Sequence, residues 1–407
     1  MLSAAALASA AGFAQFGVAA ALADVAAAFG EPQPDLGLTD VAGLSGTALG
    51  VGLSLIRLAS LAALPLGALG DRLGRRRVLL WSAAIGLSVT ALAALSPSYV
   101  LFVVVFALGR PFLSAVNALA IVFAAEETPA HQRARAVALI GASYGFGAGL
   151  IAVIRGVAED ALGFRGLFAL ALLPLSLLPV IASRLEETER FEIAHAEATP
   201  PRLGAVPRPF RRRLALVCAL TAAIGLVSGP ANSFLFFFGE SVKGLSAGTM
   251  ALAVLASAPL GVAGLGVGRW IADHIGRRVA AAAALAGIAA TAIATYSFGE
   301  AGVLVGYPIG LFFAGAYAPA AGSLNTELFP TEIRATTAGW LTACNVLGAV
   351  AGILGYGLLV DSLEGFGLAM SFIALPVIVI SVLYARLPET RGLELEQSYA
   401  SGPQNAL

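Results

Sequence analysis

The 407-residue chain is 58% hydrophobic and 12% charged, and its 24 basic residues balance 24 acidic ones. Soluble proteins carry about 25% charged residues because their surface faces water. This composition and a mean hydropathy of +0.88 exclude a soluble protein, and the zero net charge gives no reason to expect a nucleic-acid partner.

Twelve apolar runs follow one another along the chain, each close to the length that crosses a bilayer as a helix. Their length, without a ten-residue alternation, favours helices over the strands of a membrane barrel. The first run has no basic segment before it and is followed by similar runs, so we expect a retained helix rather than a cleaved signal. The predicted spans are 3–29, 41–69, 78–95, 99–124, 135–156 and 164–183, then 213–238, 246–270, 279–298, 301–325, 335–359 and 366–385.

The basic residues gather on one side of the predicted membrane. Nineteen of the 24 lie in the loops after spans 2, 4, 6, 8 and 10 or in the C-terminal tail, whereas the loops 30–40, 96–98, 299–300 and 360–365 contain none. Positive charge marks the cytoplasmic side. We therefore expect a multi-pass protein of the cell (inner) membrane with both termini in the cytoplasm.

Three polar markers occur twice, at a constant separation. The segment DRLGRR at 71–76 returns as DHIGRR at 273–278, and RLEET at 184–188 returns as RLPET at 386–390, both 202 residues later. EETP at 126–129 returns as ELFP at 327–330, which is 201 residues later. Three matches in register indicate a duplication. The predicted parts are a six-helix half at 1–185, a cytoplasmic linker at 186–212, a second half at 213–387 and a tail at 388–407.

These repeated loops resemble those of the major facilitator superfamily. The segment 67–77 is similar to the signature loop between helices 2 and 3 of that family, and 327–334 and 387–392 are similar to loops of its sugar porters and metabolite symporters. The resemblance implies an all-α membrane transporter with twelve transmembrane helices in two pseudo-symmetric halves. It also implies a substrate site between the halves and transport by alternating access.

The resemblance also implies a charged gate at the repeated loops. Gly74 permits a tight turn, and a carboxylate such as Asp71 at a helix N-terminus contributes about 0.3–1 kcal/mol, which suits a contact that must form and break. In the second copy Arg269 replaces Gly67 and His274 replaces Arg72, so we expect a weaker gate there. The assigned gate residues are Asp71, Arg72, Gly74, Arg75, Glu126 and Arg133, with Asp273, Arg277, Glu327, Arg334, Glu389 and Arg391.

Two arginines are predicted near the middle of the membrane, where a charge costs about 2.5–3.5 kcal/mol on insertion scales. Either arginine could bind an anionic substrate or be fixed by backbone carbonyls or a carboxylate. We favour substrate binding for Arg110, because helix 4 lines the cavity in the family that the chain resembles. We favour the structural role for Arg57, because helix 2 flanks that cavity.

Asp24 is the only carboxylate well inside a predicted span. We expect it to reach the outer water from its helix end; the alternative is a proton-coupling acid that pairs with an arginine when it is deprotonated.

The chain departs from the sugar-porter pattern in two places. Phe16-Gly17 is not followed by a carboxylate, and the helix-4 arginine lies at 110 instead of near Phe106. These departures speak against hexose transport.

The sequence therefore predicts a secondary active transporter of a small polar, anionic organic metabolite, coupled to protons or to exchange. An efflux pump for amphipathic compounds is the first alternative, although 141–149 lacks the Gly-Pro of drug–proton antiporters. A transporter-like ligand sensor is the second. We expect a monomer that is not an enzyme and has no cofactor or metal. The candidate substrate-binding residues are Gln15, Arg110, Asn117, Tyr144, Asn232, Tyr317 and Asn345, with Asp24 and Arg57 as candidates for coupling or charge compensation.

Overall fold

The computed structural model describes residues 1–30, 43–129, 132–187 and 206–391, apart from the side chains at 71, 133, 134, 159, 160, 331, 332 and 335. This part of the chain is helical and contains twelve helices that are long and apolar enough to cross a membrane. Together with the structural likeness reported below, they confirm the predicted fold class. The protein is an all-α, multi-pass membrane protein with two six-helix halves.

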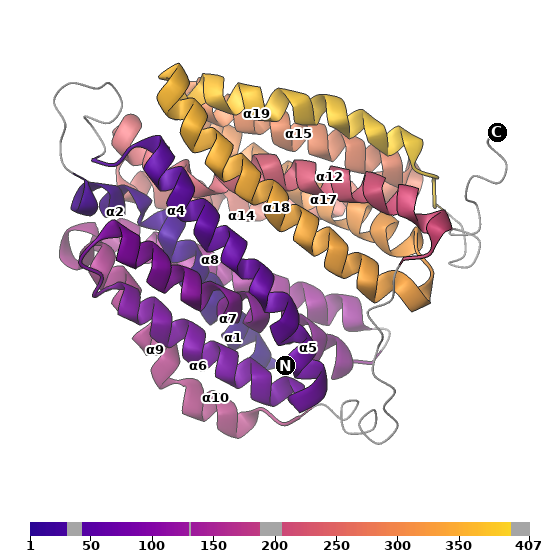
Figure 1. The fold of residues 1–407 in the computed structure, drawn as a ribbon, viewed down its shortest axis with the longest axis horizontal. Coiled ribbons are helices and arrows are strands. Elements are labelled where there is room, and N and C mark those ends of the chain that lie inside the picture. The colour runs from indigo at the N-terminus through magenta and orange to yellow at the C-terminus, as the bar shows by residue number, and fades with distance from the viewer. Residues whose placement is uncertain (31–42, 130–131, 188–205, 392–407) are drawn as a thin grey trace. The chain divides into compact units, whose positions relative to one another are not determined.

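The helices of the first half follow the predicted spans closely (Figure 1). They are α1 (Leu2–Ala20), α2 (Leu22–Phe29), α4 (Gly46–Ala59), α5 (Ala63–Leu73), α6 (Arg75–Ala93), α7 (Tyr99–Glu126), α8 (Arg133–Ala169), α9 (Leu172–Ser176) and α10 (Leu178–Arg184). Those of the second half are α12 (Arg208–Ser233), α13 (Leu235–Phe237), α14 (Ala247–His274), α15 (Arg277–Ser297), α16 (Gly299–Ala301), α17 (Tyr307–Glu327), α18 (Thr331–Leu363) and α19 (Phe366–Ser381).

Some spans are interrupted where the sequence predicts continuous helices. The first span breaks at Ala21, between α1 and α2. The second passes through a 3₁₀ turn (Ser60–Ala62). The fifth and sixth spans share the label α8 but are two helices, separated by non-helical backbone at Ala158 and Gly163. Gly163 has φ +52°, a left-handed conformation that glycine adopts without steric cost.

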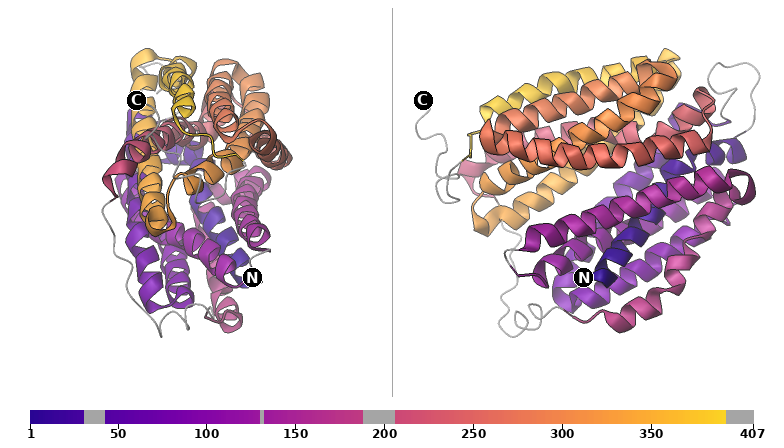
Figure 2. Two further views of the ribbon diagram at one scale, coloured as in Figure 1. Left: turned by 90° about the vertical axis from the view of Figure 1, so that its right-hand side faces the viewer. Right: turned by 180° about the vertical axis from the view of Figure 1, so that it is seen from behind.

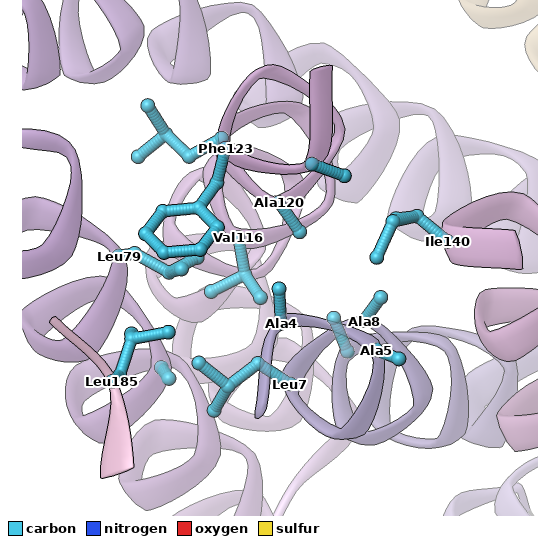
Figure 3. Packing of buried hydrophobic residues seen from close by; sticks show 14 of the residues in the cluster. Ala4, Ala5, Leu7, Ala8, Leu79, Val116, Ala120, Phe123, Ile140 and Leu185 are labelled. Carbon is cyan, nitrogen blue, oxygen red and sulfur yellow. The ribbon is translucent and has the colours of Figure 1, made fainter. Parts of the chain in front are cut away.

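The chain forms two compact units, which we describe separately. Unit 1 comprises residues 1–44, 52–201 and 240–251, and unit 2 comprises 45–51, 202–239 and 252–407. In unit 1, α1 packs on α8 and α7, and α6 packs on α7. Small residues such as Ala4, Ala8 and Ala120 form the core between them with Leu7 and Phe123 (Figure 3). Small side chains let transmembrane helices approach closely, because packing rather than water drives their association.

In unit 2, α12 packs along α18, and α15 packs between α17 and α19 (Figures 1 and 2). Glycines permit the α12–α18 contact, since a Cβ on Gly225 would lie 2.2 Å from the carbonyl oxygen of Asn345. On the outside of both units, large apolar side chains such as Trp81, Phe146 and Phe372 are exposed. Such a surface suits lipid and not water.

Candidate functional site

The first repeated loop holds a network of arginines and glutamates in unit 1. Gly74, with φ +101°, precedes α6. The guanidinium of Arg75 donates to both carboxylate oxygens of Glu126, with Nη2 2.8 Å and Nε 3.0 Å from Oε1. Glu187 accepts the backbone N–H of Arg76 at 3.0 and 3.1 Å, at the N-terminus of α6, where the helix dipole favours a carboxylate. Arg76 in turn donates to the carbonyl oxygens of Ala182 and Leu185.

The second repeated loop builds the same network in unit 2. Arg277 forms an ion pair with Glu327. Glu389 accepts the backbone N–H groups of Arg277 and Arg278 at 3.0 and 3.2 Å, and Arg278 donates to the carbonyl oxygens of Ala385 and Leu387. Each partner lies 201 to 203 residues after its counterpart, so the duplication extends from the sequence to individual contacts.

Burial alone would raise the pKa of the Glu389 carboxyl group, but the backbone N–H groups of residues 277, 278, 391 and 390 hold that pKa below its ordinary value. The carboxylate form therefore caps α15.

The other gate candidates have simpler surroundings. Asp273 pairs at 3.5 Å with Arg269 on its own helix, and both are exposed. Arg334 donates to the carbonyl oxygens of Thr326 and Phe329, and Arg391 donates to that of Ile275. Arg72 is exposed. The side chains of Asp71 and Arg133 lie outside the described part of the chain.

Unit 1 also contains two arginines deep within their spans. In the twelve described spans, Arg57 on α4 and Arg110 on α7 are the only charged residues more than ten positions from both ends. They lie close enough to interact electrostatically, and each also interacts electrostatically with Tyr144 on α8. Three helices therefore bring two positive charges and one hydroxyl together.

The polar atoms around these arginines are incompletely bonded within the described residues. Arg110 Nη1 donates to the backbone carbonyl of Gln15 at 3.4 Å, and Tyr144 donates to Gln15 Oε1 at 3.4 Å. Arg57 Nε, Arg110 Nε and Gln15 Nε2 are buried without a hydrogen-bond partner, as is Asn117 Oδ1, seven residues beyond Arg110 on α7. Buried polar atoms of this kind are rare in native structures and point to a ligand or water.

A close approach of α1 to α8 places Gln15 beside Tyr144. A Cβ on Gly12 would lie 2.0 Å from the carbonyl oxygen of Tyr144, and one on Gly147 would lie 1.9 Å from that of Ser9. Glycine is required at both points, because any side chain would separate the helices.

Asp24 does not pair with either mid-span arginine. It accepts hydrogen bonds from Arg155 Nε at 3.0 Å and Nη2 at 2.8 Å. Arg155 Nη1 and Nη2 also donate to Glu240. The side chain of Arg155 is 1% exposed, so one buried guanidinium joins the carboxylates of α2 and of the π-helical turn at 238–242.

Sequence reasoning assigned no role to Arg155 or Glu240. A signal was nevertheless present, because Arg155 lies three residues from the end of its apolar span, where an arginine needs either water or a carboxylate.

The three candidates in the second half are bonded to neighbouring groups in unit 2. Asn232 donates to the carbonyl oxygen of Ser228 at 2.8 Å, and Asn345 donates to that of Thr221 at 3.4 Å. The hydroxyl of Tyr317 lies 2.7 Å from that of Tyr384. The bond of Asn232 lies within α12, whereas those of Asn345 and Tyr317 join separate segments. These bonds leave fewer groups available to a ligand than in unit 1.

The twelve spans, the duplicated halves and their matching charge networks are those of a multi-pass membrane transporter. The Major Facilitator Superfamily model matches residues 2–315. The chain belongs to that superfamily, whose members are transporters and not enzymes.

Several relatives are similar over most of their length. The probable 4-methylmuconolactone transporter of Cupriavidus pinatubonensis is 25% identical over 349 residues, which are 81% of this chain and 79% of that protein. The gallate transporter of Pseudomonas putida is 27% identical over 372 residues, which are 82% of each. A putative metabolite transport protein of Haemophilus influenzae is 26% identical over 332 residues, which are 78% of this chain and 75% of that protein.

Solved structures share the fold. The inward-open xylose transporter XylE of E. coli has a TM-score of 0.78, 18% identity and 98% coverage of both chains. A D-xylose-proton symporter has a TM-score of 0.75 with 18% identity, covering 96% of this chain and 98% of its own. Both neighbours have the fold that the sequence predicts.

Proposed function

We propose that this protein is a secondary active transporter of a small organic anion, and that Arg110 binds the anionic group of the substrate. The observation that carries the proposal is the pair of mid-span arginines in unit 1, whose Nε atoms are buried without a partner in the described residues. Arginine presents a planar set of donors that matches a carboxylate. Tyr144 and the amide of Gln15 supply further hydrogen bonds at the same place.

The charge distribution of the whole chain supports an anionic substrate. Every Asp and Glu in the sequence lies outside the twelve candidate spans or within three residues of the end of one. The carboxylate that could have compensated the arginines, Asp24, is held by Arg155. A carboxylate substrate would therefore meet positive charge and no competing acid.

The relatives add independent support. Two are named as transporters of gallate and, with the qualifier probable, of 4-methylmuconolactone, which are small oxygen-rich organic compounds. A fold neighbour is titled a proton symporter, which favours proton coupling over exchange. The basic loops support a monomer in the inner membrane with both termini on the cytoplasmic side, and the repeated networks around Glu126 and Glu327 support a role as the gate.

A ligand screen on purified protein tests the proposal. Pairs of equal shape that differ in charge, such as benzoate and benzamide or gallate and methyl gallate, are compared by thermal unfolding. A ligand at 100 times its Kd stabilises the folded state by about 2.7 kcal/mol. We expect stabilisation by carboxylates and none by their neutral partners.

Arg110→Ala should abolish this stabilisation, and Arg110→Lys should weaken it, because lysine lacks the bidentate donors. The unfolding temperature without ligand should not fall in Arg110→Ala, because an unpaired charge leaves the membrane interior. Arg165→Ala is the matched control, since Arg165 is exposed and donates to the carbonyl oxygen of Ser96. Equal response of Arg110→Ala and wild type to every acid would overturn the proposal.

A further inference from the structure

The two arginines of unit 1 carry an inference about the charge of the substrate, which rests on the proposed function. Arg110 and Arg57 interact electrostatically with each other and with the same tyrosine, Tyr144. Both guanidiniums therefore border one site. The sequence alone favours a structural role for Arg57, but its electrostatic interaction with Arg110 and its buried, unbonded Nε make it a candidate for the same site as Arg110.

Neither guanidinium has a counter-charge in the described part of the chain. Arg57 makes no side-chain hydrogen bond or ion pair there, and Arg110 makes one long bond to a neutral backbone carbonyl. Three carboxylates close to the ends of spans bind other groups and do not compensate these arginines. Asp24 and Glu240 bind Arg155, and Asp361 accepts the N–H groups of Gly46 and Thr47 at 2.8 and 2.7 Å.

Two neighbouring positive charges in an apolar span repel each other, and each carries its own insertion cost. A ligand with one carboxylate would compensate only one of them. We infer that the site formed by Arg57, Arg110, Tyr144 and Gln15 takes an organic dianion, with one anionic group on each guanidinium.

The geometry also explains the neutral groups of the site. Gln15 contacts both Arg110 and Tyr144, and the hydroxyl of Tyr144 and the unbonded amide nitrogen of Gln15 offer donors to a polar substituent on the carbon skeleton that joins the two anionic groups. A monocarboxylate with a hydrophobic body would leave one guanidinium and these donors without partners, at a cost comparable to lost hydrogen bonds.

Binding of phthalate and of its monomethyl ester tests this inference, because the two share a skeleton and differ by one negative charge. The wild-type protein should bind phthalate at least about tenfold more tightly, since one charged hydrogen-bonded contact contributes such a factor or more. Isophthalate and terephthalate, compared with their monoesters, extend the test to other separations of the two groups.

Arg57→Gln should bring the ratio of the two dissociation constants, monoester over phthalate, to about one, because phthalate loses more affinity than the monoester. Arg165→Gln, at an exposed position outside the site, should leave the ratio as in wild type. If Arg57→Gln does not fold, the ratio measured in the wild-type protein still decides.

Different binding results would contradict the organic-anion transporter and the dianion site. Binding of no carboxylate at all would overturn the proposed function and this inference with it. Equal or tighter binding of the monoesters in every pair would overturn the dianion alone and leave the organic-anion transporter in place. Equal binding of sulfate and phthalate would assign an inorganic dianion and overturn the organic one.

Discussion

Arg155 binds the carboxylates of Asp24 and Glu240. Removal of its guanidinium would take this partner from two carboxylates that are largely buried. The two side chains are 27% and 9% exposed. Loss of one partner from a buried ion pair costs about 3–5 kcal/mol. We therefore expect Arg155→Met, which keeps the length of the side chain, to lower the unfolding temperature and the membrane abundance of the protein.

The matched control is Arg165→Met on the following span, whose side chain is exposed and should contribute less than about 1 kcal/mol. A double-mutant cycle with Asp24→Asn measures the interaction directly, and the combined loss should be smaller than the sum of the single losses. If Arg155→Met unfolds at the same temperature as Arg165→Met, the three-residue network does not stabilise the protein.

At the scale of single residues, the sequence could single out the mid-span arginines but not their partners. Arg110 was expected to contact the substrate because of its depth and its helix, and this role stays a prediction. Arg57 has the same depth, but depth does not say which way a side chain points around a helix. The partner of Asp24 could not be predicted either, because Arg155 is 131 residues away in the sequence.

Helices α6 and α15 begin in the same way, at a glycine with positive φ and a glutamate from a distant loop. The repeated RLEET and RLPET segments predicted this equivalence, because they place Glu187 and Glu389 at the same point of each half. Helix breaks such as the one at Ala21 were not predicted. Alanine favours the helix on its own, so such a break depends on tertiary packing.

Glu389→Gln tests the cap of α15. The folded-state pKa of Glu389 lies below its ordinary value of 4.5, so the carboxylate stabilises the fold above that value, and the stabilisation is lost as the pH falls through the folded-state pKa. We expect the variant to be less stable than wild type by about 1 kcal/mol at pH 7, as for other lost helix caps. The difference should begin to shrink below about pH 4.5 and should close below the folded-state pKa.

Glu186→Gln is the control, because Glu186 is an exposed carboxylate in the corresponding loop of the first half. Thermal unfolding of the three proteins across pH gives the measurement. A difference between Glu389→Gln and wild type that persists unchanged at low pH would show that the charge of Glu389 does not act in this way.

At the scale of the whole molecule, the duplication in the sequence predicted the fold. Three sequence markers in register indicated two halves of six helices, and the contacts Arg75–Glu126 and Arg277–Glu327 repeat at the same offsets. Substrate identity could not be predicted in this way, because the repeated residues lie at the ends of spans and the charged site lies in one unit only.

The orientation in the membrane is tested by cysteine labelling. In a protein with Cys218→Ser and Cys344→Ser, a membrane-impermeant thiol reagent should modify Gln33→Cys in intact cells and spare Thr199→Cys, because the linker around 199 is rich in arginine. Both positions lie outside the described residues. Permeabilised cells should label both, and the reverse pattern in intact cells would invert the topology.

We propose that the protein moves an organic anion held by Arg110. Counterflow in proteoliposomes tests it most directly, with an excess of the tightest-binding acid inside and a trace of the same acid, isotopically labelled, outside. We predict transient accumulation of label by the wild-type protein and by Arg165→Ala, and none by Arg110→Ala at equal protein content. Accumulation by Arg110→Ala at the wild-type rate, or binding without accumulation by the wild type, would contradict the account.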